Sequence, residues 1–147
     1  VWTWGNSEYG QGAQGKKIDR ILEPLEIKLN GVRDVAAGGP FSLFLTSDGF
    51  VYTCGYGALG LGFETIETLE LKKVEGLDNI VKVFATTDYA AALSADGELF
   101  TWGLNGPSSR LGLGHTDHAF TPKRVSINKK VANVSLGVNH ALVLCED

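Results

Sequence analysis

The stretch Val1-Trp2-Thr3-Trp4-Gly5 returns twice along the chain, as Val51-Tyr52-Thr53-Cys54-Gly55 and as Leu99-Phe100-Thr101-Trp102-Gly103. The glycines that close the three stretches lie 50 and then 48 residues apart. Self-similarity at a fixed period of about 50 residues is the sequence signature of a repeat architecture. Repeats build extended surfaces more readily than enclosed catalytic pockets, so the pattern favours a binding function.

The unit at residues 80–131 contains four short runs that predict β-strands. These runs cover residues 80–85, 89–94, 98–102 and 120–125. They show no helical period, and Asp96-Gly97 between the second and third runs is the signature of a hairpin turn. Pro122 in the fourth run favours an edge position, because proline cannot donate a ladder hydrogen bond.

Four antiparallel strands in each unit of about 50 residues are typical of a β-propeller blade. We therefore predict an all-β fold with three repeat units, at residues 1–49, 50–97 and 98–147, each cut at the position of the Asp-Gly turn. The alternative, a β-sandwich of unrelated strands, does not explain the fixed period. Residues 65–70 are the one ambiguous stretch, because their pattern also fits a helix.

The composition argues against several classes of function. The 147 residues carry a net charge of −4, which offers no overall attraction to nucleic acid or to an anionic membrane. No apolar run approaches the roughly 18 residues of a membrane span. Cys54 and Cys145 lie in different repeats without metal-ligand spacing, so we expect reduced, structural thiols and no metal. Methionine is absent, so we expect the natural product to begin upstream.

Two stretches match the dinucleotide-binding fingerprint G-x-G-x-x-G, at residues 10–15 and 55–60. That chemistry requires a helix whose N-terminal amides hold the pyrophosphate, and no amphipathic helix follows either stretch. We therefore interpret both as repeated glycine turns and expect no cofactor. The serines, histidines and aspartate at 108–118 share one loop without a nucleophile elbow, and we expect no catalytic residue.

The repeated positions resemble the regulator of chromosome condensation repeat. The pattern of that repeat includes a glycine before the second strand, an Asp-Gly turn, Trp-Gly after an aromatic residue, Leu-Gly-x-Gly, and a later Pro-x-x-Val. The chain matches it at Gly38, Asp48-Gly49, Tyr52, residues 59–62, Asp96-Gly97, Phe100, Trp102-Gly103, Asn105, residues 111–114, residues 122–125, Gly137 and His140. Cys54 in place of tryptophan and Thr86 in place of glycine are departures from it.

Within this family, residues 4–9, 55–62 and 98–103 look most like the mitochondrial branch. The resemblance implies a seven-bladed propeller, of which three units form an arc. It also implies that the ring closes by sharing one blade between both chain ends, which removes exposed edges. An isolated arc is expected to present two open sheet edges and to aggregate.

The resemblance also implies where a partner binds, because the family uses the loops just before the second strand of each blade. It points to Pro40, Phe41, Asp88, Tyr89, Asn139 and His140 as partner-binding residues. The loops differ from one repeat to the next, as expected where only the frame is repeated. His140 occupies the position of Phe41 and Tyr89, so a bulky structural residue at a strand start is the competing interpretation.

The function implied is a non-enzymatic propeller scaffold for protein or ribonucleoprotein interactions, in mitochondrial ribosome or respiratory-complex assembly. We expect a protein partner, either a GTPase or a ribosome-assembly factor, and a mitochondrial location, with nuclear or cytoplasmic locations as alternatives. The alternative function is guanine-nucleotide exchange on a small or dynamin-like GTPase. Asp88 and His140 lie in suitable loops for it, but no wedge-like insertion is visible. RNA contact is a third possibility that the net charge does not support, since the small basic clusters have acidic neighbours.

Overall fold

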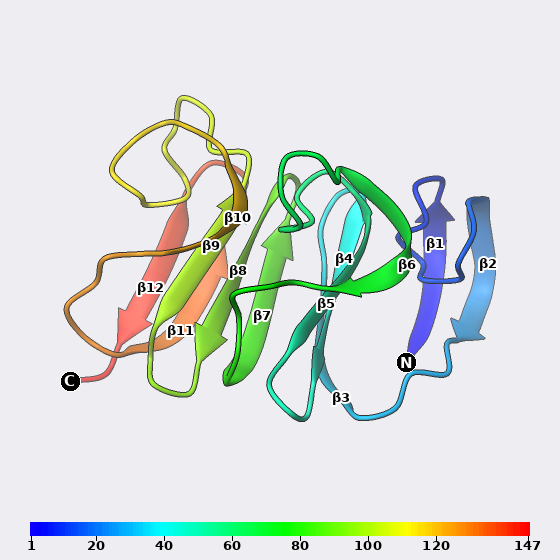
Figure 1. Ribbon diagram of the computed structural model, residues 1–147, viewed down its shortest axis with the longest axis horizontal. Helices are drawn as coiled ribbons and strands as arrows, with labels where there is room; N and C mark the ends of the chain where they lie inside the picture. Colours follow the sequence, from blue (N-terminus) through cyan, green and yellow to red (C-terminus); the bar gives the residue numbers. More distant parts are fainter.

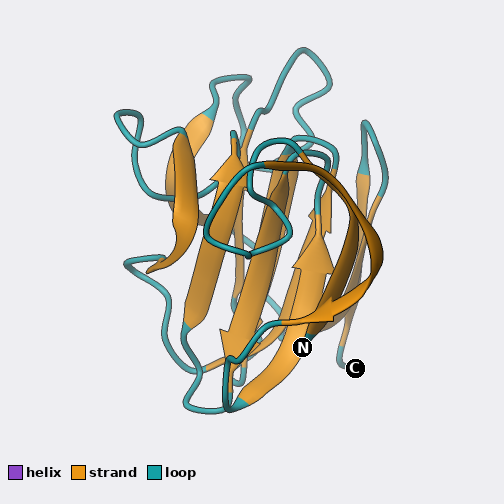
Figure 2. Ribbon diagram, turned by 90° about the vertical axis from the view of Figure 1, so that its right-hand side faces the viewer, coloured by secondary structure: helices purple, strands orange, loops and turns teal.

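The chain folds into a row of four antiparallel β-sheets, and the computed structural model describes all 147 residues. The strands are β1 (Trp2–Ser7), β2 (Ile18–Glu26), β3 (Val32–Ala37), β4 (Phe41–Thr46), β5 (Val51–Tyr56), β6 (Glu67–Lys73), β7 (Ile80–Thr86), β8 (Tyr89–Ser94), β9 (Leu99–Gly103), β10 (Ala119–Arg124), β11 (Val131–Leu136) and β12 (Ala141–Cys145). Figure 1 shows the sheets side by side in chain order, and Figure 2 shows strands joined by loops. The predicted all-β fold with four-stranded sheets is confirmed.

The two central sheets are complete meanders, with the strand orders β3-β4-β5-β6 and β7-β8-β9-β10. Gly49 and Gly97 adopt φ angles of 89° and 81° in the hairpins between the second and third strands, as the Asp-Gly turns require. Of the ambiguous residues 65–70, the last four form the start of strand β6, and none is helical. Pro122 lies in β10 at the edge of its sheet. The edge position predicted from the missing N–H of proline is therefore also confirmed.

The two end sheets hold two strands each and correspond to complementary halves of a complete sheet. The unit boundaries at 49/50 and 97/98 fall in the hairpins, so each complete sheet takes two strands from each of two successive units. By the same phase, β1 and β2 match a third and fourth strand, whereas β11 and β12 match a first and second strand. One edge of β1 and one edge of β12 therefore have no partner strand in this chain.

The core lies between neighbouring sheets. Leu43 of the second sheet shares the larger apolar cluster with Val83 and Trp102 of the third sheet. Leu93 of the third sheet and Val134 of the fourth belong to a smaller cluster at the next junction. The fold is therefore stabilised by sheet-to-sheet contacts that recur along the row, and each sheet depends on its neighbours to bury its faces.

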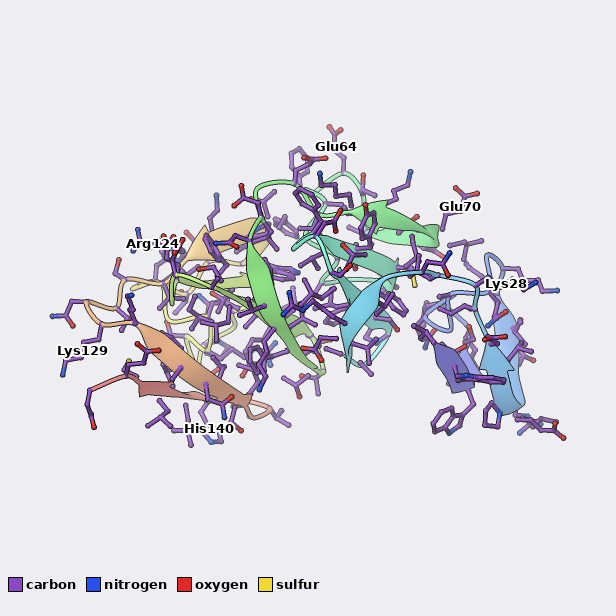
Figure 3. All side chains as sticks on the ribbon, turned by 90° about the horizontal axis from the view of Figure 1, so that it is seen from below. Lys28, Glu64, Glu70, Arg124, Lys129 and His140 are labelled. Carbon is purple, nitrogen blue, oxygen red and sulfur yellow. The ribbon has the colours of Figure 1, made fainter.

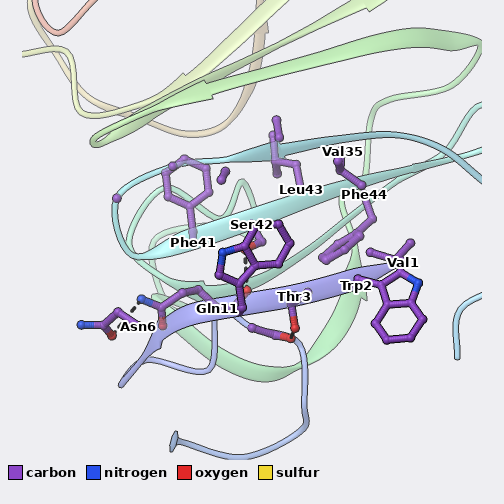
Figure 4. A pocket seen from close by; sticks show the side chains of 16 residues that line it. Val1, Trp2, Thr3, Asn6, Gln11, Val35, Phe41, Ser42, Leu43 and Phe44 are labelled. Atoms are coloured by element: carbon purple, nitrogen blue, oxygen red, sulfur yellow. Dashed lines mark hydrogen bonds between the residues drawn. The ribbon is translucent and has the colours of Figure 1, made fainter. Parts of the chain in front are cut away.

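Where the neighbouring sheet is incomplete, the equivalent core positions are exposed. Val35 in β3 is 52% exposed, whereas Val83 at the same position in β7 is 5% exposed. Figure 4 shows the hollow of about 410 Å³ between β1 and the β3–β4 hairpin, with Trp2, Val35 and Phe44 in its lining. At the next junction, β3 and β4, the first and second strands of the second sheet, pack against β7 and fill the corresponding space. We therefore interpret this hollow as an unfilled position in the packing between sheets and not as a ligand site.

The glycine that closes each repeated stretch of the sequence has a structural role. Gly103 has a φ of 114°, and a Cβ there would lie 2.5 Å from the carbonyl oxygen of Asp88. Gly55, with a φ of 109°, would meet the carbonyl oxygen of Pro40 in the same way. Glycine thus lets the third strand pass close to the loop that precedes the second strand. No helix follows either G-x-G-x-x-G stretch, in agreement with their interpretation as turns.

Candidate partner-binding face

The predicted site residues lie on three loops, or at the first position of the strand that follows, at one end of the strands, which is the upper end in Figure 1. The loops join β3 to β4, β7 to β8, and β11 to β12. The amide of Gly39 in the first loop donates a hydrogen bond of 2.9 Å to the carbonyl oxygen of Thr87 in the second loop. The loops between the third and fourth strands reach the same end, since consecutive strands are antiparallel. We call this end the loop face.

The six predicted residues fall into an exposed set and a buried set. Asp88, Asn139 and His140 are exposed and Pro40 is half-buried, whereas Phe41 and Tyr89 are fully buried. Phe41 and Tyr89 belong to the large cluster between the second and third sheets. Their side chains therefore support the loops, and they present no surface to a partner.

Tyr89 fastens the third sheet to the fourth. Its hydroxyl oxygen lies 2.7 Å from the carbonyl oxygen of Gly137 and 2.8 Å from that of His140, so one proton serves two acceptors. Burial raises the pKa of the Tyr89 phenol, and the positive charge of Arg110 opposes that rise. Phe41 holds the same position one sheet earlier without a hydroxyl group. Tyr89 therefore fixes the loop that carries His140.

Arg110 is a residue of the loop face that the sequence reasoning missed. Its Nε–H donates to the carbonyl oxygen of Leu104 at 2.8 Å, and its Nη1–H donates to that of Val138 at 2.7 Å. The guanidinium carbon lies 4.8 Å from the centre of the Tyr89 ring, and Nη2 lies 3.9 Å from a carboxylate oxygen of Asp88. The side chain is only 9% exposed, so it lies buried between the two loops. Its two hydrogen bonds hold the β9–β10 loop against the β11–β12 loop. The available signal was an arginine in a glycine-rich loop with no arginine at that place in the other units.

Asn105 organises the long β9–β10 loop from within. It is fully buried, and its Nδ2 donates to the carbonyl oxygens of His115 at 2.6 Å and Asp117 at 3.0 Å. Its Oδ1 accepts from the amide of Leu111, and its own amide donates to Nδ1 of His118, both at 3.0 Å. A buried amide with all these partners holds a loop in one conformation, since each broken bond would leave a buried polar group unpaired.

Reactive side chains do not converge on the loop face. The hydroxyl of Ser109 donates to the carbonyl oxygen of His115 at 2.7 Å. Both cysteines are free thiols, and burial raises the pKa of Cys54 to about 12. No group of three or more His, Cys, Asp and Glu side chains is placed to hold a metal ion. The structure contains no helix that is long and apolar enough to cross a membrane.

A hollow of about 230 Å³ opens on the loop face between the second and third sheets. Its side-chain walls are mostly apolar and come from Pro40, Tyr56, Ala58, Ile66, Leu104, Ala119 and Phe120, and glycine backbone forms a further part of the lining. Asp88 is the charged residue of the lining. We call this cavity the junction hollow.

Large apolar side chains are exposed around the junction hollow. The exposed large apolar residues of the loop face are Tyr9, Tyr56, Phe63, Ile66, Leu104, Phe120 and Val138. Tyr9 and Tyr56 lie with ring centres 5.2 Å apart, which extends the apolar surface onto the first sheet. Exposed apolar groups gathered at one end of a fold are typical of a protein interaction site.

Two of the small basic clusters contain a residue with an acidic partner, and these two residues lie apart from one another. Lys17 pairs with Glu67 at 2.6 Å, and Arg124 pairs with Glu98 at 3.6 Å. Figure 3 places Arg124 far along the row from Lys28. The paired Lys17 and Arg124 therefore do not belong to one stripe of the kind that follows a nucleic-acid backbone, whereas Arg124, Lys129 and Lys130 line one hollow.

Sheets in a radial row, each burying its face on the next, and loops gathered at one end define an arc of a β-propeller. Residues 96–144 match the Regulator of chromosome condensation (RCC1) repeat. The chain thus carries an RCC1 repeat and has the fold of RCC1 propellers. The resemblance noted from the sequence is confirmed at the level of the repeat and the fold.

The relatives cover the whole chain, but the chain covers only part of them. Human E3 ubiquitin-protein ligase HERC2 is 37% identical over 158 residues, which is 100% of this chain and 3% of HERC2. Mouse RCC1-like G exchanging factor-like protein is 31% identical over 159 residues, which is 99% of this chain and 34% of that protein.

Solved propeller structures also match nearly the whole chain, and the chain again covers only part of them. The crystal structure of human WBSCR16 matches with a TM-score of 0.89 and 30% identity over 98% of this chain and 39% of that chain. Yeast RCC1 (Prp20) bound to Kap60 matches with a TM-score of 0.81 over 94% of this chain and 36% of that chain. At 21% identity, the yeast protein shows the shared fold alone. The present chain thus spans between a third and two fifths of these propeller chains.

Proposed function

We propose that the chain is an arc of a non-enzymatic propeller scaffold whose loop face binds a protein partner. The observation that carries the proposal is the gathering of exposed apolar side chains on loops that buried residues hold in place. Loops fixed before binding lose little conformational entropy when a partner docks, so more of the contact energy appears as affinity. The yeast propeller bound to Kap60 supports protein binding as a use of this fold.

The test is site-specific photo-crosslinking on the full-length gene product. A photoreactive residue at Phe63 or Asn139 on the loop face is expected to give one identified crosslinked protein in native extracts. The same residue at Asp96, in the hairpin at the opposite end of the third sheet, is the matched control. Loss of the crosslink in Phe120→Asp, with the fold unchanged by circular dichroism, supports the loop face. An equally strong crosslink from position 96 would contradict it.

Guanine-nucleotide exchange is the second candidate. Asp88 and His140 are exposed on the loop face, and a mouse relative of 31% identity is named an RCC1-like G exchanging factor-like protein. The assay is the release of labelled GDP from small and dynamin-like GTPases. Faster release with the wild type than with Asp88→Ala or His140→Ala favours exchange. Release rates that none of the three proteins changes exclude it for the GTPases tested.

A mitochondrial location, with a role in ribosome or respiratory-complex assembly, belongs to the same proposal. Its support is the likeness of residues 4–9, 55–62 and 98–103 to the mitochondrial branch of the family. Protease protection of the tagged gene product in isolated mitochondria tests the location, and a signal confined to the nucleus or cytoplasm would contradict it. Ultraviolet crosslinking of RNA tests direct contact with a ribonucleoprotein, for which the ion-paired Lys17 and Arg124 give no support.

A further inference from the structure

The β5–β6 and β9–β10 loops carry the same motif with one important difference. Ala58-Leu59-Gly60-Leu61-Gly62 in the first loop corresponds to Arg110-Leu111-Gly112-Leu113-Gly114 in the second. Leu59 and Leu111 are both fully buried, so the two motifs are anchored in the same way. The residue before the leucine is alanine in the second sheet and arginine in the third.

Arg110 occupies the junction between the third and fourth sheets on the loop face. Its neighbours are the Tyr89 ring, the carboxylate of Asp88 and the carbonyl oxygens of Leu104 and Val138. The side chain therefore fills the space between two loops of neighbouring sheets.

The junction hollow lies at the corresponding place one sheet earlier. Ala58, the counterpart of Arg110, is part of its lining. Pro40 and Tyr56, which also line it, are the counterparts of Asp88 and Leu104 beside Arg110. The cavity of about 230 Å³ is thus the space that a long side chain fills at the next junction and that alanine leaves empty here. It is smaller than the roughly 300–1,000 Å³ of small-molecule sites, so it fits one side chain better than a cofactor.

The negative charge of Asp88 at the junction hollow favours a positively charged side chain in it. Asp88 is its charged lining residue, and its side chain is 51% exposed. The carboxylate accepts no hydrogen bond from the protein, since Nη2 of Arg110 stays 3.9 Å away while Nε and Nη1 donate to carbonyl oxygens. Its oxygens are therefore free to accept from a partner. An apolar side chain in the hollow would desolvate this carboxylate without giving it a hydrogen bond.

From these features we infer that the junction hollow accepts an arginine side chain presented by the protein partner, with its guanidinium on Asp88. The three methylenes of the arginine lie along Pro40 and Leu104, and the aromatic rings of Tyr56 and Phe120 suit the flat face of the guanidinium. Arginine fits better than lysine, because its planar fork can donate two parallel hydrogen bonds to one carboxylate. The inference rests on the proposed binding function and names the chemistry of the partner.

The test uses N-acetylarginine amide as the probe, titrated into the isotope-labelled full-length gene product and followed by amide chemical shifts. N-acetylcitrulline amide is the control ligand, because it has the same length and shape without the charge. We expect saturable shifts at Gly57, Asp88 and Leu104, and binding at least tenfold weaker for the citrulline probe. Asp88→Asn should weaken the arginine probe at least tenfold, whereas Asp96→Asn, a matched change at the opposite end of the sheet, should leave it unchanged.

Ala58→Arg provides a second, independent variant. It restores at this junction the residue that the next junction already holds, so it should fill the junction hollow and block the probe. Equal affinity for arginine and citrulline probes, shifts away from the junction hollow, or undiminished binding in Ala58→Arg would overturn the inference. If the probe fails while photo-crosslinks from Asn139 persist, the inference alone falls. If the probe binds and no crosslink forms on the loop face, the proposed function falls instead.

Discussion

Replacing Arg110 by alanine should loosen the loop face while leaving the sheets folded. Its hydrogen bonds to the carbonyl oxygens of Leu104 and Val138 have a charged donor, and such bonds contribute about 1.5–3 kcal/mol each. Both acceptors belong to exposed residues, so water recovers part of the loss. The ion pair with Asp88 adds little, because that carboxylate is half exposed and 3.9 Å away. We expect the free energy of opening the β9–β10 loop to fall by about 2 kcal/mol.

Native-state hydrogen exchange measures this local opening directly. The amide of Leu104, which donates to the carbonyl oxygen of Asp88, and the amide of Gly112, which donates to that of Ser109, report on the loop. A loss of about 2 kcal/mol corresponds to about 30-fold faster exchange at these amides. A local measurement is needed because neighbouring sheets of a repeat fold can open separately.

Arg124→Ala is the matched control for this measurement. Arg124 is 62% exposed and its partner Glu98 is also exposed to solvent, so its loss should change exchange in the loop by less than about threefold. Exchange at Leu104 and Gly112 that is no faster in Arg110→Ala than in Arg124→Ala would refute the role of Arg110 as a clamp. Exchange that rises equally across β7 and β8 would also refute it, since it would indicate loss of the whole sheet.

Three further changes test other parts of the structure. Tyr89→Phe should lower the free energy of unfolding by about 1 kcal/mol in urea, because the shared hydroxyl proton is lost, and an unchanged midpoint would contradict this. Burial raises the folded pKa of Cys54 from 9.0 to about 12, so its contribution to stability is present below pH 9 and is lost as the pH rises toward 12. Cys54 should therefore also react with iodoacetamide more slowly than Cys145 in the folded protein, and equal rates would disprove its burial. Leu142→Lys together with Leu144→Lys should reduce self-association of the isolated chain, because both leucines are exposed on β12, a strand with an unpaired edge. Light scattering measures this, and unchanged scattering would show that the chain associates through another surface.

The strands and hairpins of this fold could be predicted because their signals are local. Asp96-Gly97 carries its turn conformation in its own backbone preferences, and Pro122 indicates an edge through its missing N–H. The repeat period adds a second, independent signal, since each segment can be compared with its copies. Even the ambiguous residues 65–70 could have been assigned to a strand from their counterparts near Phe120, which lie in β10.

The roles of individual side chains on the loop face could not be predicted, because they depend on contacts between distant segments. Arg110 contacts the carbonyl group of Val138, 28 positions later, and Tyr89 contacts that of His140, 51 positions later. The sequence gives both members of each pair but not the register that brings them together. For the same reason, Phe41 and Tyr89 were predicted on the binding surface, while the packing of adjacent sheets buries them completely.

The two junctions on the loop face differ in a way that explains how a repeated frame becomes specific. At the third–fourth junction, Tyr89 and Arg110 tie the loops together and leave the space between them filled. At the second–third junction, Phe41 lacks the hydroxyl and Ala58 lacks the long side chain, so the junction hollow stays open beside Asp88. The two junctions also differ in charge, since Asp88 beside the junction hollow corresponds to Asn139 at the next junction. An arc of this kind can therefore hold one junction rigid and keep the neighbouring one open beside a carboxylate, so that the side chains placed on a repeated frame decide where a partner binds.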